Sequence, residues 1–365
     1  MAAEASQSVA IVGGGPAGMA LALALKHHGV TAEIFEARER AAVGRDPRVL
    51  ALSDGARQIL EWLGVWSKLS ATPIEAIHIS QRGGFGRTLL RATELDLKTL
   101  GWVLSASDLI AALDAAVSVA GIGYRDNRKV GAGDTAMFQL TAYAEGAVEA
   151  GAGEMRDYGQ HAVLCSVSVA APHHNVAWER FTSDGPVALL PLGDRYAVVL
   201  TCADETLADV KALDDAAFLA HLQQRFGTRH RFTAASPRTA YPLGLRYRPN
   251  PVGARQVWLG NAAQTLHPVA GQGFNLALRD IWELAQALGA AADPGAPEVL
   301  AAYASGRQTD RRGAIAFTDL LIDGFASGFA PLKHARGAGL LALDLLPPLR
   351  AFVAKRMIYG ARAWP

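Results

Sequence analysis

Hydrophobic and polar positions near the N-terminus predict a strand, a helix and a second strand in succession. Val9–Val12 is a short apolar run rich in β-branched residues, which is typical of a buried parallel strand. Met19–His28 is rich in Ala and Leu and predicts a helix that ends at Gly29. Thr31–Phe35 predicts the second strand, which stops at Glu36. Together these elements form the start of a βαβ unit.

Glycines occupy the turn between the first strand and the helix in the pattern G-x-G-x-x-G. Gly13 permits a tight turn, Gly15 lets the backbone approach a pyrophosphate, and Gly18 allows helix and strand to pack closely. The helix N-terminus supplies free N–H groups for phosphates. Glu36 is placed to bond ribose hydroxyls, which favours an unphosphorylated ribose. The pattern predicts a site for FAD or NAD and does not choose between them.

A second strand–loop–helix joint is predicted two-thirds of the way along the chain. Gln256–Gly260 predicts a buried strand, which Asn261 follows. The segment HPVAGQGFN breaks the chain with Pro and Gly, and from Phe274 to Gly289 apolar residues recur at helical spacing. A glycine-rich loop at a helix start favours negative charge, such as that of a reduced flavin near N1 and O2.

The middle of the chain predicts strands and few helices. Two runs around the turn Gly83–Gly86 predict a hairpin, and Ser105–Gly121 predicts a helix capped by Ser105 or Ser107. Leu207–Phe226 predicts one further helix. Strand-like runs that we expect to form one sheet lie at residues 161–171, 177–184, 186–194 and 195–204.

The segment Leu320–Tyr359 is apolar, interrupted by Gly and Pro, and carries many basic side chains. These are Lys333, Arg336, Arg350, Lys355 and Arg356, with Arg362 just beyond. A basic amphipathic segment with Trp and Tyr near its end is suited to a membrane interface. Helix packing within the chain combined with a dimer contact is an equally supported interpretation.

Composition narrows the classes of function without identifying one. The chain has 365 residues, 50% of them hydrophobic, with 35 basic and 34 acidic residues, so a large core is available and no basic excess predicts nucleic-acid binding. Cys165 and Cys202 lie far apart without a histidine cluster, which predicts two buried thiols and no metal site. The chain shows no signal-peptide pattern and no long charge-free stretch, so a cytoplasmic location is expected.

The second joint carries the most specific pattern in the chain. GNAAQTLHPVAGQGFNLALRD, at Gly260–Asp280, resembles the second flavin motif of the aromatic hydroxylases that hold one FAD, the group that includes para-hydroxybenzoate hydroxylase. More narrowly, the chain resembles the ubiquinone-biosynthesis hydroxylases and among them the 2-polyprenyl-6-methoxyphenol hydroxylases, which often carry Asn where Asn261 stands. RVLALSDGARQILEWLGVW, AWERFTSDGPVALLPL and RTAYPLGL carry the same resemblance, at residues 48–66, 177–192 and 238–245.

The resemblance implies an α/β fold with interleaved domains. A Rossmann-like FAD-binding domain of the para-hydroxybenzoate hydroxylase (GR2) type would consist of residues 1–70, 101–160 and 243–300. Residues 71–100 and 161–242 would form an antiparallel-sheet substrate domain, and residues 301–365 would form C-terminal helices.

The resemblance also assigns cofactor contacts position by position. The ADP half would lie around the first glycine turn and Glu36, the ribityl–phosphate region around Gly260 and Asn261, and the isoalloxazine ring beside Pro268. The full set of expected FAD contacts is Gly13, Gly15, Pro16, Ala17, Gly18, Glu36, Arg38, Arg48, Gly260, Asn261, Pro268, Gly271, Gln272, Gly273, Phe274 and Asn275.

The chemistry that the resemblance implies is hydroxylation of an electron-rich phenol. NAD(P)H would reduce FAD, O₂ would add, and a flavin C4a-hydroperoxide would transfer its distal oxygen to a polyprenylated methoxyphenol in ubiquinone biosynthesis. His267, beside the flavin-ring neighbour Pro268, is a candidate proton relay. The alternative, that His267 hydrogen-bonds loop backbone, has the greater weight.

One family motif has no evident counterpart in the sequence. The family places Asp-Gly, then Ser, then Arg after a strand between the two flavin motifs, where it touches the flavin and is proposed to touch NAD(P)H. Between Gly121 and Tyr158 we assign MFQLTAYAEGAVEA to the family's preceding strand and hairpin, which leaves only GAGEM for the motif. The expectation is a flavin domain that lacks one strand, a turn and a short helix.

This departure leaves two alternatives to the main prediction open. One is a soluble hydroxylase of small aromatics, and the other is a catalytically silent homologue that serves as a subunit of a quinone-synthesis complex. The expected partners are a polyprenyl phenol and O₂, with homo-oligomer or complex formation left open. Because a polyprenyl phenol lies in the bilayer, peripheral contact with the inner face of the membrane is the working hypothesis for location.

Overall fold

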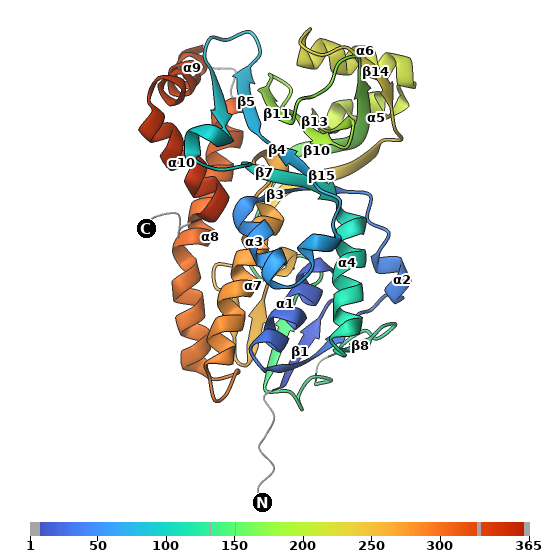
Figure 1. Cartoon of the computed structure of the whole chain (residues 1–365), viewed down its shortest axis with the longest axis vertical. Coiled ribbons are helices and arrows are strands. Elements are labelled where there is room, and N and C mark those ends of the chain that lie inside the picture. The colour runs from blue at the N-terminus through green and yellow to red at the C-terminus, as the bar shows by residue number, and fades with distance from the viewer. Residues whose placement is uncertain (1–7, 132, 150, 327–329, 361–365) are drawn as a thin grey trace, which may run out of the picture.

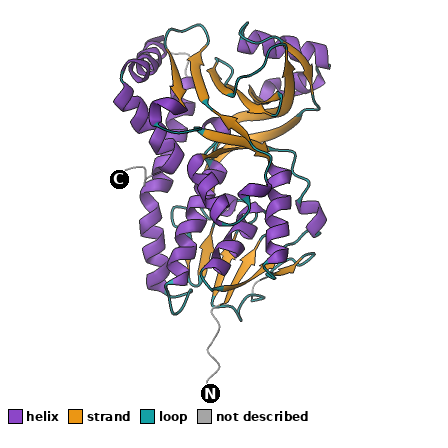
Figure 2. Cartoon of the chain, in the orientation of Figure 1, coloured by secondary structure: helices purple, strands orange, loops and turns teal. Residues whose placement is uncertain are grey.

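A mostly parallel sheet, called the parallel sheet below, and a larger, mostly antiparallel sheet lie along the long axis of the molecule, with the C-terminal helices running down one side (Figure 1). The computed structural model describes residues 8–131, 133–149, 151–326 and 330–360. Figure 2 shows helices packed against the parallel sheet. Each of the two sheets has its own hydrophobic core.

The parallel sheet contains the predicted βαβ unit. Helix α1 (Pro16–His27) connects the two strands that begin it, and the strand order is β16-β17-β9-β1-β2-β8. The strands are β1 Ser8–Val12, β2 Thr31–Phe35, β8 Gly123–Arg125, β9 Leu140–Tyr143, β16 Val252–Gly253 and β17 Gln256–Trp258. The predicted strands and the predicted helix are confirmed to within about three residues at their ends.

The expectation of a missing strand in this sheet is wrong. Leu140–Tyr143 lies in the segment assigned from the sequence to the family's preceding strand and hairpin. It forms β9, which pairs in parallel with β1 on one side and β17 on the other. The edges of β1 and β17 are therefore covered, as buried backbone requires. The shortening of this region relative to the family pattern does not remove a strand beside β1. The described residues of 126–139 form turns and bends, and those of 144–153 form no helix.

The larger sheet has nine strands in the order β18-β15-β10-β13-β12-β11-β5-β6, with β14 paired to β10. Its strands are β5 Ala76–Gln81, β6 Arg87–Arg91, β10 Glu154–Val169, β11 Val176–Phe181, β12 Val187–Leu192, β13 Arg195–Ala203, β14 Phe232–Ala235, β15 Thr239–Tyr247 and β18 Gln264–Thr265. The hairpin and the four strand-like runs predicted from the sequence are confirmed as β5–β6 and β10–β13. The division of the chain into domains stays a prediction.

One predicted helix is broken in two. The stretch expected as Leu207–Phe226 forms α5 (Asp204–Ala212) and α6 (Asp215–Phe226), which together cover the outer face of the large sheet. The break occurs because the Asp214 side chain accepts a hydrogen bond from the Ala217 N–H at 2.8 Å and starts a new helix. The cap predicted at Ser105 is confirmed: its side chain accepts from the Asp108 N–H at the start of α4 (Ala106–Val119).

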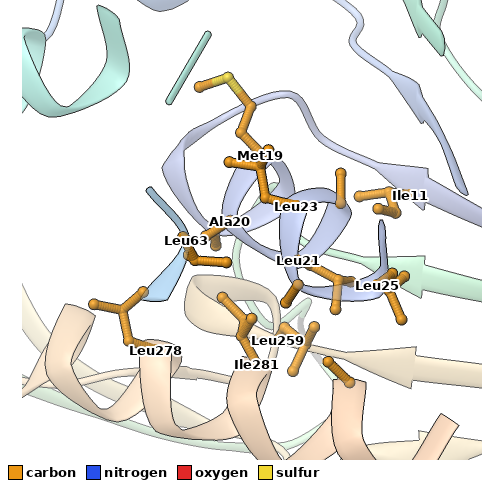
Figure 3. Close-up of a cluster of buried hydrophobic side chains, with 14 of the residues drawn as sticks. Ile11, Met19, Ala20, Leu21, Leu23, Leu25, Leu63, Leu259, Leu278 and Ile281 are labelled. Atoms are coloured by element: carbon orange, nitrogen blue, oxygen red, sulfur yellow. The ribbon is translucent and has the colours of Figure 1, made fainter. Parts of the chain in front are cut away.

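Helix α1 lies at the centre of the flavin-side core. Its Ala and Leu residues pack against β1 and against α7 (Gly273–Gly289), so the helices that follow the two glycine-rich loops touch one another (Figure 3). Leu21 and Leu25 of α1 and Ile281 of α7 are completely buried. Burying each such side chain contributes about 1.5–3 kcal/mol, so this contact fixes the relative position of the two loops.

The remaining elements connect the two sheets. Strands β3 (Val49–Ser53), β4 (Thr72–Ile74) and β7 (Gly101–Ser105) form a small antiparallel sheet between them. The other elements are helices α2 Arg40–Val43, α3 Asp54–Trp62, α8 Pro297–Ala326, α9 Ala330–Leu345 and α10 Pro347–Tyr359, with short 3₁₀ turns. Within the described chain, no single helix has the length and hydropathy needed to cross a bilayer; His334–Leu345 and α10 together pass that test but meet at 99°.

Candidate active site

The glycine turn between β1 and α1 has the geometry that its sequence pattern predicts. Gly13 has a φ of +113°, and a side chain there would meet Glu145, with Cβ atoms 2.5 Å apart. A Cβ on Gly18 would overlap the Gly13 carbonyl oxygen, so this glycine does allow close packing. At Gly15 a Cβ would meet no atom within 4 Å. The turn is thus crowded on its protein side and open at the position expected to approach a pyrophosphate.

A glycine that the sequence pattern did not single out is also constrained. A Cβ on Gly14 would overlap the hydroxyl of Tyr124, which donates a hydrogen bond to the Gly14 carbonyl at 3.3 Å. Tyr124 lies in β8, at the far edge of the parallel sheet. No local pattern connects residues so distant in sequence, so this contact was not predictable.

The first turn of α1 is suited to an anion. Its N-cap is Gly15, which offers no side chain to the free backbone N–H groups, and Pro16 begins the helix. These N–H groups and the helix dipole favour a phosphate. Together with the open space at Gly15, they fit the pyrophosphate of a dinucleotide.

Glu36 ends β2 as predicted and is buried, with 1% of its surface exposed. One carboxylate oxygen accepts the Gly14 N–H at 2.9 Å, and the other accepts the backbone N–H and Nε of Arg38 at 3.0 and 2.8 Å. Burial opposes its ionisation, but the hydrogen bonds from Arg38 and Gly14 outweigh burial and lower the pKa of Glu36. The carboxylate is therefore an ionised acceptor at the place expected for ribose hydroxyls.

Glu145 and Gly146 stand where the family motif has Asp-Gly. They follow β9, and Glu145 lies against Gly13 of the glycine turn. Burial and the neighbouring charge of Glu36 raise the pKa of Glu145. The residues that follow Gly146 are Ala, Val and Glu, so the Ser and Arg of the motif are absent from those places. Glu145-Gly146 was not predicted as a site because the family pattern has Asp at the first position.

The second joint meets the first at the N-terminus of α1. Gly260 begins a 3₁₀ turn after β17 with a φ of +54°, and its Cβ position lies 3.4 Å from the Cβ of Ala17. Asn261 in the same turn is exposed. The structure therefore brings together the two motifs expected to hold the ADP half and the ribityl–phosphate region.

His267 begins the loop of the second joint and caps it. Its Nδ1 accepts the Val269 N–H at 3.0 Å, which confirms the interpretation that this histidine bonds loop backbone. Its Nε2 is buried, with no partner among the described residues. Burial lowers the pKa of His267 to about 4, so the ring is neutral at physiological pH.

Asn275 fixes the loop to the small connecting sheet. Its Oδ1 accepts the Ser53 N–H at 2.8 Å, and its Nδ2 donates to the carbonyls of Ala51 and Gly271 at 2.9 and 2.6 Å. The side chain predicted to contact flavin is thus occupied by the protein, which leaves the loop backbone for a ligand. Gln272 is similarly engaged, because its Nε2 donates to the Met357 carbonyl at 3.2 Å.

The other predicted contacts fall at the loop and at its approach. Pro268 and Gly273 are exposed, and Phe274 lies in the first turn of α7. Arg48 is exposed and paired with Asp46, whose carboxylate lies 2.6 Å from the guanidinium. Of these four residues, Arg48 is the one whose side chain forms an ion pair.

A buried ionic network behind the loop was not predicted. Asp280 of α7 accepts from Gln264 at 2.7 Å and from Arg307 of α8 at 2.7 Å. Arg307 also bonds Asp310, which pairs with Arg279 at 2.8 Å. The network joins α7, α8 and β18, which directly precedes the loop from His267 to Gly273, called the flavin loop below. Its members are too far apart in sequence for a local pattern to show it.

A small hollow lies between the flavin loop and the large sheet. His267 and Val269 line it from the loop, and Leu321 and Ile322 line it from α8. The large sheet contributes Gln160, Phe181, Thr182, Gly185 and Pro186. The hollow is therefore placed between the expected flavin position and the sheet expected to bind substrate.

Sequence comparison agrees with this geometry. The family described as "FAD binding domain" matches residues 6–163 and 146–318, and the two matches overlap just after Glu145. The chain is 31% identical to ubiquinone hydroxylase UbiL of Rhodospirillum rubrum, over 95% of this chain and 88% of that protein. It is 30% identical to 3-demethoxyubiquinol 3-hydroxylase of Escherichia coli, over 95% of this chain and 96% of that one.

Solved structures share the fold at low identity. A p-nitrophenol 4-monooxygenase of Pseudomonas putida superposes with a TM-score of 0.76 at 17% identity, over 98% of this chain and all of that one. The Klebsiella pneumoniae protein HpxO, solved with FAD and uric acid, gives a TM-score of 0.75 at 16% identity, over 100% of this chain and 98% of that one.

Proposed function

Because the chain belongs to the FAD-dependent monooxygenases of the class A flavoprotein hydroxylase family, related to those of ubiquinone biosynthesis, we propose that it hydroxylates a polyprenylated methoxyphenol. FAD is its cofactor, and enzymes of this class use NAD(P)H. The bound flavin would supply the activation of O₂, and the protein would position the ring and exclude water.

The meeting of the two glycine-rich joints at α1 carries the proposal. Gly15 leaves open space beside an uncapped helix start, and Gly260 brings the second joint to the same place. Glu36 supplies an ionised acceptor beside them. In this arrangement Gly13–Gly18 and Glu36 would hold the ADP half, and the loop backbone after His267 would border the flavin ring.

The central β9 strand weakens the argument for a catalytically silent homologue. That alternative was made because the middle Asp-Gly motif is missing, and the strand expected to be lost with the motif is present as β9. Glu145-Gly146 would serve in place of the motif's Asp-Gly, since a carboxylate and a flexible residue occupy the same sheet position. The absent Ser and Arg then predict weaker binding of NAD(P)H, not loss of FAD.

The proposal is tested by spectroscopy and turnover on the purified protein. We expect flavin absorption at one FAD per chain, and NAD(P)H oxidation that a 2-polyprenyl-6-methoxyphenol stimulates and 4-hydroxybenzoate does not. A protein that stays colourless after FAD is added would contradict the proposal. Equal stimulation by 4-hydroxybenzoate would favour the soluble hydroxylase of small aromatics.

We further propose that the corner between α9 and α10 contacts the membrane that holds such a substrate. The corner exposes large apolar side chains on both helices, namely Leu341, Leu345, Leu346, Leu349 and Phe352. Phe352 also borders an apolar cavity of about 190 Å³ that reaches Gln272 of the flavin loop, with Phe317 and Met357 in its wall. A cavity of this volume can hold part of a prenyl chain.

Liposome binding tests the corner. Intact protein should co-sediment with vesicles that contain anionic lipid, and Leu345→Glu combined with Leu346→Glu should reduce binding about tenfold or more, because charged side chains are costly in the interface. Val119→Glu is the matched control, since Val119 is 90% exposed on α4, on the other side of the molecule in Figure 1. Equal loss in both variants, or no binding by the intact protein, would overturn this part of the proposal.

A further inference from the structure

Glu179 is an acidic side chain in the interior with no structural partner. It lies in β11, directly beside Ile79 of β5 and Ala188 of β12. Its Oε1 is buried and makes no hydrogen bond within the described chain. An unpaired buried carboxylate is unfavourable, so Glu179 lowers the stability of the fold. A functional role would explain why the chain carries it.

Strand alternation places Glu179 on the face of the large sheet that is turned toward the flavin domain. Trp178 packs into the core under α6, so Glu179 points to the opposite side. Phe181, two residues further along β11, points the same way and lines the hollow beside His267. Ala177 and Leu190 on this face join the cluster that packs against α10 and the small connecting sheet.

That face of the sheet is only partly covered. Along β12, Ala188 and Leu190 are half-buried, whereas Val187 and Leu189 on the other face are completely buried. Glu179 itself is half-buried in spite of its depth. We call this face the floor: the side chains beside Glu179 on it are apolar, namely Ile79, Ala177, Ala188 and Leu190. Phe181 extends the floor to the hollow beside His267.

Among the described residues, no neighbouring charge compensates Glu179. Arg180 and His78 lie on the opposite face, and β12 contributes Ala and Leu here. The titratable groups that we place on this side from other elements are the neutral His267 and Tyr241 of β15, and Tyr241 interacts electrostatically with Arg48. Burial alone raises the pKa of Glu179 to about 8.

We propose that the protonated carboxyl of Glu179 donates a hydrogen bond to the hydroxyl oxygen of the aromatic substrate and stabilises its phenolate. This rests on the proposed function, because the floor lies where an aromatic ring would meet the flavin. The O–H bond of the phenol breaks, its proton passes to water, and the electron pair stays on the phenolate oxygen, which accepts the hydrogen bond from Glu179. The phenolate is a more electron-rich ring and therefore a better acceptor of an electrophilic oxygen.

The assignment accounts for an apolar floor with a single polar group. A ring with prenyl and methoxy substituents needs apolar contact over most of its surface and one polar partner for its hydroxyl. Because burial keeps the Glu179 carboxyl protonated at physiological pH, it can donate a hydrogen bond to a phenolate, whereas an ionised carboxylate would repel that charge. Glu179 would thus select hydroxylated rings over unsubstituted ones.

Ionisation of a bound phenol tests the proposal without turnover. The FAD-loaded protein is mixed with 2-geranyl-6-methoxyphenol in the absence of NAD(P)H, and phenolate is followed by ultraviolet difference spectra across pH. Wild type should lower the ionisation midpoint of the bound phenol by about one unit or more, a tenfold effect, relative to Glu179→Met, which has no donor. Glu179→Gln, whose amide N–H still donates, should keep part of the shift. Glu75→Gln is the control, because Glu75 is exposed beside β5 and bonds only Asn175.

Stability and steady-state measurements separate this role from a structural one. Glu179→Met should lower kcat about 100-fold, while FAD affinity and melting temperature stay equal or rise. Glu179→Gln, which still donates a hydrogen bond, should keep more of the activity. Equal ionisation midpoints in wild type and Glu179→Met would overturn the role of Glu179 alone. Failure of the wild type to bind the phenol would overturn the proposed substrate class as well.

Discussion

At the scale of single residues, contacts from distant segments constrain the glycines of the first joint. The roles of Gly13 and Gly18 follow from a local pattern, and the structure confirms the tight turn and the close packing. Gly14 depends on Tyr124, and Glu179 depends on which face of β11 is turned inward. Such contacts require the tertiary arrangement, which no single segment encodes.

Two glycines of the first turn should respond oppositely to alanine. Gly18→Ala forces a Cβ against the Gly13 carbonyl, so it should destabilise the protein by about 1–3 kcal/mol and abolish FAD binding. Gly15→Ala meets no atom and has an extended backbone, so its stability should be unchanged or higher by about 0.4–1 kcal/mol. FAD affinity should still fall about tenfold, because the new methyl group occupies the phosphate approach. Thermal unfolding and fluorescence titration with FAD measure the two effects, and a stable Gly18→Ala that binds FAD would contradict the close packing.

The pH dependence of stability should reveal Glu179. The pKa of its carboxyl is about 4.3 in an unfolded chain and about 8 in the folded one. Between these values the folded state binds the extra proton, so the free energy of unfolding falls as pH rises through this window. The melting temperature of Glu179→Gln relative to wild type should therefore increase from about pH 5 to about pH 8. A difference that stays constant with pH would contradict the raised pKa.

At the scale of elements, periodicity located most strands and helices but assigned one strand to the wrong place. Leu140–Tyr143 falls in the segment assigned to the family's preceding strand and hairpin, yet its pairing with β1 and β17 places it in the middle of the parallel sheet. The predicted helix at Leu207–Phe226 broke at a capping residue, Asp214. A local pattern shows that a strand exists, and only pairing in the sheet shows which one it is.

The ionic network between α7 and α8 should stabilise the flavin loop. Arg307→Met removes the partner of Asp280 and one partner of Asp310, both buried, so it should destabilise the protein by about 3–5 kcal/mol. Arg125→Met breaks an exposed pair with Glu33 and should change stability by about 1 kcal/mol or less. Chemical denaturation measures both variants. FAD should also dissociate faster from Arg307→Met, and equal stability of the two variants would contradict this role.

At the scale of the whole molecule, the resemblance predicted the fold class, and the structure adds how its parts meet. The first and second joints come from segments far apart in sequence and meet at the N-terminus of α1, and the hollow beside His267 brings the second joint against Phe181 of the sheet face that carries Glu179. Phe352 at the apolar corner of α9 and α10 borders the cavity that reaches Gln272. These contacts are consistent with the proposed approach of a membrane-held substrate to the flavin.

The central claim is that this chain transfers one oxygen atom from O₂ to a polyprenylated methoxyphenol. The most direct measurement supplies the FAD-loaded protein with NAD(P)H, ¹⁸O₂ and 2-geranyl-6-methoxyphenol, and determines the mass of the product. We predict a hydroxylated phenol that carries a single ¹⁸O atom, formed in proportion to NAD(P)H oxidised. Oxidation of NAD(P)H that yields only hydrogen peroxide, with no labelled phenol, would contradict the account.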